Sequence, residues 1–177
     1  MRALIDSIES EYRRYKKLAE GALEQMPDEA LGRVGADFGN SAATIAWHVG
    51  GNLASRFTDF LTSDGEKPWR DREGEFASRA GVPRAELMAH WEKGWSVLFD
   101  ALAALQDTDL CRTVTIRNVP LTVGEALHRS LSHAASHAGQ IVLLGRMARG
   151  ADWTWLSIAP GGTAAYNANP TKEKGGR

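Results

Sequence analysis

The chain has 177 residues, of which 43% are hydrophobic and 24% charged, as expected for one globular domain of ordinary size. Its formal net charge of −1 provides no broad basic surface, so we expect neither a nucleic-acid partner nor a membrane partner. The single cysteine, Cys111, excludes an intrachain disulfide, and no apolar signal or bilayer-spanning run is seen, so we expect a cytoplasmic protein.

The first half of the chain predicts two amphipathic helices. Apolar residues spaced by three and four predict a helix over about 3–25, followed by a Gly- and Asp-rich connection over 27–40. A second helix should begin at Asn40 or Ser41, either of which can act as an N-cap, and run to about Leu61. A long polar loop then follows over 63–81, and loops of this length in compact domains are often functional.

The second half predicts two more helices around a small hairpin. A third helix opens at Pro83 and carries an apolar stripe as far as Leu105. Residues 112–122 are typical of a β-hairpin that turns at Arg117-Asn118. The fourth helix should begin with a capping box formed by Thr122 and Glu125 and end at Gly150.

Four helices of about 20 residues predict an all-α four-helix bundle, with the hairpin inserted before the last helix. The irregular segment 151–169 carries aromatic side chains, so we expect it to pack on the bundle and to complete a domain spanning 1–169. The polar residues 170–177 are expected to be a disordered tail.

His133 and His137 are the most informative pair in the chain. Four residues are one helical turn, so both imidazoles project from one face and can bind a single divalent ion. Both lie on or beside the apolar arc of the fourth helix, whereas His128 lies on the polar side and is read as a surface residue. The alternative is a pair of core histidines satisfied by hydrogen bonds or water.

His48 is the third candidate ligand. It shares a polar stripe with Ser41, Thr44, Asn52, Ser55 and Asp59. Taken alone, this stripe favours a solvated face, and the alternative is a polar seam lining a cleft between helices. Asn52 and Gln140 would then be the residues that orient the ligands. His90 is read as structural or exposed, and Cys111 is not read as a nucleophile.

Two histidine motifs, 46–52 and 132–141, resemble those of the DinB-like (DinB/YfiT) superfamily. The run Asp-Gly-Glu-Lys-Pro-Trp at 64–69 and the tail motifs at 153–160 and 164–168 resemble one branch of it, DUF1572. The resemblance implies a four-helix bundle, often dimeric, with a metal site formed by the positions of His48, His133 and His137. Some relatives are transferases or isomerases that use low-molecular-weight thiols. Here Ala159-Pro-Gly-Gly stands where relatives tend to carry a basic residue before Gly, which puts a substrate contact there in doubt.

Three functions follow as hypotheses. The first is a metal-dependent enzyme in which Zn²⁺ or Ni²⁺ on the three histidines activates a thiol cosubstrate or water against a small molecule, as an S-transferase or hydrolase. The second is a non-catalytic metal-binding or stress-related bundle, in which the metal stabilises the fold or a homodimer. The third is a plain interaction module whose histidines are incidental.

Overall fold

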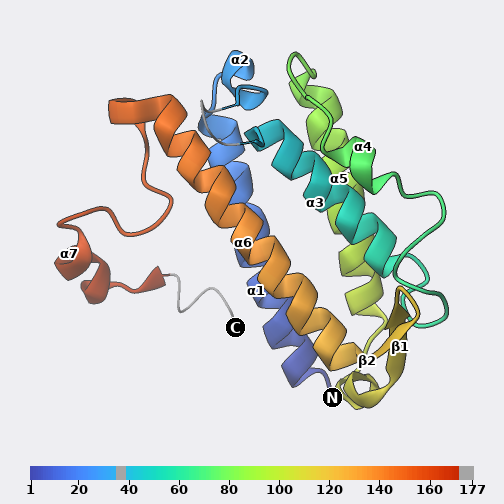
Figure 1. Ribbon diagram of the computed structural model, residues 1–177. Coiled ribbons are helices and arrows are strands. Elements are labelled where there is room, and N and C mark those ends of the chain that lie inside the picture. The colour runs from blue at the N-terminus through green and yellow to red at the C-terminus, as the bar shows by residue number, and fades with distance from the viewer. Residues whose placement is uncertain (35–38, 172–177) are drawn as a thin grey trace.

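The computed structural model describes residues 1–34 and 39–171, and its architecture is mostly helical with one small hairpin. The four long helices are α1 (Ala3–Gln25), α3 (Ala42–Phe57), α5 (Arg84–Ala103) and α6 (Val123–Arg149). Helix α1 packs along α6, while α3 lies between α5 and α6 and contacts both (Figure 1). The existence and order of the four predicted helices are therefore confirmed. Among the described residues, no helix is both long and apolar enough to cross a bilayer.

Short elements fill the connections. They are the helices α2 (Asp28–Leu31), α4 (Arg72–Glu75) and α7 (Thr163–Ala168), the 3₁₀ turns η1 (Asp107–Cys111) and η2 (Gly150–Asp152), and the strands β1 (Thr113–Ile116) and β2 (Val119–Thr122). The strands pair antiparallel, and Arg117 and Asn118 at the turn have φ of 56° and 61°. Positive φ at both central residues matches the right-handed twist of a two-residue hairpin. The predicted hairpin and its turn are confirmed.

The predicted ends of the second helix need one correction. Ser41 caps α3 by accepting a hydrogen bond from the Thr44 backbone N–H, as expected. However, α3 ends at Phe57 and does not reach Leu61, because Thr58 is extended and Asp59 takes a left-handed φ of 48°. The apolar spacing continues past this break because Phe60 still packs into the core as a turn residue. The capping box of Thr122 with Glu125 at the start of α6 is confirmed.

The segments predicted as irregular carry more structure than expected. The 63–81 region contains α4, which lies against α3 (Figure 1). In the 151–169 region Trp153 and Leu156 pack against the core, whereas Trp155 and Ile158 are 40% and 36% exposed. The predicted packing of this segment is therefore correct for only part of it. Residues 172–177 of the predicted tail lie outside the described residues.

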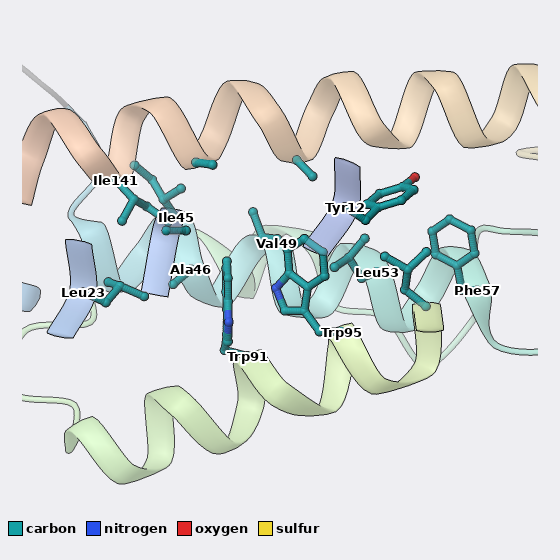
Figure 2. Close-up of a cluster of buried hydrophobic side chains, with 14 of the residues drawn as sticks. Tyr12, Leu23, Ile45, Ala46, Val49, Leu53, Phe57, Trp91, Trp95 and Ile141 are labelled. Carbon is teal, nitrogen blue, oxygen red and sulfur yellow. The ribbon is translucent and has the colours of Figure 1, made fainter. Parts of the chain in front are cut away.

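The hydrophobic core runs between the long helices. Trp91 and Trp95 of α5 lie beside Val49 and Leu53 of α3, with Tyr12 of α1 at an edge-on contact to Trp95 (Figure 2). Helices α3 and α5 approach closely at Gly50 and Gly94, where a Cβ on Gly94 would overlap the Gly50 backbone. This contact fixes the position of α3, and α3 carries His48.

Candidate metal centre

Helices α3 and α6 bring the three candidate histidines to one point. The Nε2 atom of His133 lies 3.1 Å from Nε2 of His48 and 3.2 Å from Nε2 of His137. One ring nitrogen from each residue lies within 4.8 Å of the other two. The four-residue spacing on α6 places His133 beside His137, and the packing of α3 on α6 brings His48 to the same point.

His48 is buried, with 4% of its surface exposed. The prediction that its polar stripe faces solvent is therefore wrong. Ser41, Thr44, Asn52 and Ser55 of the same stripe are buried too. The reason is that α3 is covered on several sides: α5 packs on its apolar face, α6 on a second face and α4 on a third. The part of the stripe on α3 is therefore a buried polar seam, as in the alternative interpretation, but the cleft of that interpretation is not seen among the described residues, since His48 lines neither of the cavities described below.

Hydrogen bonds on the far side of two rings fix which nitrogen carries the proton. His48 Nδ1 lies 2.8 Å from Oε2 of Glu75, and His137 Nδ1 lies 2.8 Å from Oε1 of Gln140. A carboxylate only accepts, so His48 Nδ1 is protonated and donates, and with its amide oxygen in this position Gln140 accepts from His137 Nδ1 in the same way. Both Nε2 atoms then present lone pairs to the common point. Gln140 thus contacts His137 on the side of the ring away from the cluster, and its orienting role stays a prediction.

His133 faces both of these lone pairs. Its Nε2 carries at most one proton, so as a neutral ring it cannot donate to both neighbours at full strength, and its buried Nδ1 has no hydrogen-bond partner among the described residues. Burial first, and then His137, His48 and the cations Arg70 and Arg56, lower the pKa of His133 to about 3. Burial also lowers the pKa of His137, against a raising effect of Gln140. These two rings stay neutral at physiological pH, the state in which imidazole binds metal.

A divalent ion fits this donor set. At metal–nitrogen bonds of about 2.1 Å, neighbouring ligand atoms lie about 3.0–3.4 Å apart for angles between 90° and the tetrahedral value. The two Nε2 separations that involve His133, 3.1 and 3.2 Å, fall in this range. A cation at the common point would satisfy lone pairs that no protein donor can satisfy together. His48, His133 and His137 are thus the residues that could hold a metal.

Glu75 is the main residue of the site that the sequence did not reveal. Its carboxylate is buried against His48 and is paired with Arg70 through two bonds of 2.8 Å. Burial opposes ionisation of Glu75, but the hydrogen bonds from Arg70 and His48 outweigh it and lower its pKa. The available signal was the Arg-Asp-Arg-Glu-Gly-Glu run at 70–75, in which Asp71 caps a short helix that ends at Glu75.

The other predicted candidates contribute less. Asn52 is buried in the seam, but no hydrogen bond joins it to His48 among the described residues. Lys67 is also buried and donates to Ser63 Oγ and to the Asp64 carbonyl, while Trp69 is exposed.

The remaining histidines and the cysteine lie where the sequence placed them. His128 is exposed and Cys111 is an exposed free thiol, as expected. His90 is structural: it stacks on Trp47 and bonds to the Trp47 backbone carbonyl.

Comparison with known proteins identifies the family. Residues 1–162 match the model of a family described as protein of unknown function, DUF1572. The chain belongs to the DUF1572 family. This confirms the resemblance to DUF1572. No curated protein and no solved structure matches this DUF1572 chain.

Proposed function

We propose that this DUF1572 protein is a metal-dependent enzyme whose His48, His133 and His137 hold one divalent cation, with Zn²⁺ and Ni²⁺ as the leading candidates. The observation that carries the proposal is the convergence of three imidazole nitrogens. Two of them have their lone pairs directed inward by Glu75 and Gln140. Ordinary core histidines are satisfied by hydrogen bonds, whereas here no described side chain can donate to the inward lone pairs of His48 and His137 together at full strength.

Three protein ligands leave coordination positions open, which distinguishes catalytic from structural sites. A divalent ion bound in this way supplies Lewis-acid activation of water or of a thiol at neutral pH. Burial lowers the pKa of His133 and of His137 and so keeps these two rings neutral, while Glu75 and Gln140 accept hydrogen bonds from Nδ1 of His48 and of His137. We therefore propose an S-transferase or hydrolase acting on a small molecule. Membership of the DinB-like superfamily, its four-helix-bundle class, a low-molecular-weight thiol cosubstrate and a homodimer are parts of this proposal that rest on the resemblance.

A non-catalytic metal-binding bundle is the second candidate, and one observation favours it. Two cavities of about 470 and 510 Å³ lie at the end of α3 beside α5 and at the end of α6 beside Trp155, and none of the three histidines lines either of them. Small-molecule sites are usually concave. In this alternative the metal stabilises the protein and nothing binds at its open positions.

Cobalt substitution separates the two candidates. Wild-type protein loaded with Co²⁺ is titrated with a small thiol, and the visible and near-ultraviolet spectrum is recorded. The enzyme proposal predicts new sulfur-to-cobalt absorption that saturates with thiol concentration. A cobalt-loaded protein whose spectrum is unchanged by thiol and by pH would have no exchangeable position, and would leave the non-catalytic bundle. The His128→Ala variant serves as the control for exposed histidine.

A further inference from the structure

We propose that the segment 67–76 positions His48: Arg70 holds the Glu75 carboxylate, and Glu75 fixes His48 in the tautomer that directs the Nε2 lone pair into the histidine cluster. Glu75 and Arg70 are thus positioning residues that act through His48. The proposal deepens the proposed function, because it assigns to the long segment between α3 and α5 the control of one metal ligand.

Successive hydrogen bonds connect Arg70, through Glu75 and His48, to the histidine cluster. Arg70 donates from Nε to Oε1 of Glu75 and from Nη2 to Oε2, each over 2.8 Å. Oε2 also accepts from His48 Nδ1 over 2.8 Å, and His48 Nε2 lies 3.1 Å from Nε2 of His133. A two-point bond between guanidinium and carboxylate is directional, so the position of Oε2 is set by Arg70 and not by His48 alone.

Burial restricts the movement of the Arg70 and Glu75 side chains. The side chain of Arg70 is 2% exposed and that of Glu75 is 6% exposed, so water does not compete for their hydrogen bonds. Each charge needs the other, since an unpaired buried ion is unfavourable. The ring of Phe76, the next residue, packs on His48 with the two centroids 4.5 Å apart. The carboxylate therefore has little freedom to turn away from His48.

The cap of α4 and a glycine of α3 both help to place the Glu75 carboxylate beside His48. The Asp71 carboxylate accepts from the Gly74 backbone N–H over 2.9 Å, and this cap sets the single turn of α4 that ends at Glu75. On the other side, a Cβ at Gly51 of α3 would overlap Oε1 of Glu75. Gly51 is thus the residue that lets the carboxylate reach α3, whereas the neighbouring Gly50 serves the contact with α5.

The other two histidines lack such a device. His137 is held by the neutral amide of Gln140, which is exposed, and His133 Nδ1 has no partner among the described residues. A carboxylate behind a ligating histidine fixes its tautomer and raises its basicity, and losing such a partner typically costs about 10–100-fold in metal affinity. We therefore expect His48 to depend on Glu75 more than the other ligands depend on their neighbours.

The test uses variants that leave no charge buried alone. Arg70→Leu/Glu75→Leu replaces the pair by apolar side chains, and Gly51→Ala displaces the carboxylate while both charges remain. Glu66→Gln is the matched control, because Glu66 lies just before this segment and pairs with Arg56 of α3 and Arg117 of the hairpin without touching a histidine. The tautomer of His48 is read from its ring ¹⁵N shifts in metal-free full-length protein, and Zn²⁺ affinity is measured by chelator competition.

The expected result is an Nδ1–H tautomer of His48 in wild type and in Glu66→Gln, lost in both other variants, with Zn²⁺ affinity lowered about 10–100-fold. In a His48→Ala background the same substitutions should change Zn²⁺ affinity less than twofold. An unchanged tautomer and affinity in both variants, or an equal loss of affinity without His48, would overturn the positioning role. Wild-type protein that binds neither Zn²⁺ nor Ni²⁺ would refute the proposed function, while the His48 tautomer would still decide whether Glu75 and Arg70 position His48.

Discussion

Glu75→Gln should destabilise the metal-free protein strongly, because it breaks a buried ion pair on one side only. The variant keeps the shape of the side chain but removes the charge that faces Arg70, whose side chain is 2% exposed. Arg70 Nη1 already lacks a hydrogen-bond partner among the described residues, so no neighbour is placed to take over the lost interaction. An amide in place of the carboxylate also cannot accept both from Arg70 at two points and from His48.

The magnitude follows from burial. Removing one partner of a buried pair costs about 3–5 kcal/mol of unfolding free energy. For a chain of this size each kcal/mol lowers the melting temperature by about 2–4 °C, so we expect a decrease of about 6–20 °C. Glu66→Gln breaks contacts of a partly exposed carboxylate, and its loss should be about 1 kcal/mol or less.

The assay is urea unfolding followed by circular dichroism in the presence of a chelator, which removes any contribution from metal. The double variant Arg70→Leu/Glu75→Leu should recover at least half of the loss, because no unpaired charge stays buried. If Glu75→Gln lost no more stability than Glu66→Gln, the pair would be solvated in solution and the reasoning from burial would be refuted.

Two further predictions concern packing and pH. Gly94→Ala should lower the unfolding free energy by about 1–3 kcal/mol, because its Cβ would overlap the Gly50 backbone. Gly139→Ala on α6, where a Cβ meets open space, should raise it by about 0.5–1 kcal/mol, as measured by urea unfolding. A gain at both positions would contradict the close α3–α5 contact. Because the pKa of His133 is lowered from 6.5 to about 3, the unfolded chain binds a proton between these pH values that the native metal-free protein does not. His133 should therefore make the unfolding free energy of the metal-free protein fall on acidification by up to about 1.4 kcal/mol per pH unit, and the fall should be less steep in His133→Asn. A slope unchanged by that substitution would exclude a buried neutral His133.

Local signals in the sequence were sufficient for several features. The Thr122 and Glu125 capping box, the Arg117-Asn118 turn and the four-residue spacing of His133 and His137 each depend on neighbours along the chain, and each is present in the structure. Patterns of this kind are decided within one or two turns of backbone. Packing between distant segments has little opportunity to override them.

Features that depend on distant segments were not predictable in the same way. The stripe that contains His48 is polar, and in a helix with a single buried face such a stripe would face solvent. In this protein α4, α5 and α6 all pack on α3, so the stripe is buried. Glu75 lies 27 residues from His48, inside a segment whose composition is typical of an exposed loop. Its burial depends on Arg70 supplying the opposite charge at the same place, and that is a property of the folded chain.

Metal analysis of the untagged protein tests the central claim most directly. Wild type, His48→Ala, His137→Ala and the exposed-site control His128→Ala are purified in parallel, incubated with Zn²⁺ or Ni²⁺, desalted and assayed for bound metal. A three-histidine site predicts about one equivalent in wild type and in His128→Ala, and a loss in both of the other variants. No bound metal in wild type after incubation, or equal metal in all four proteins, would contradict the claim that His48, His133 and His137 form a metal centre.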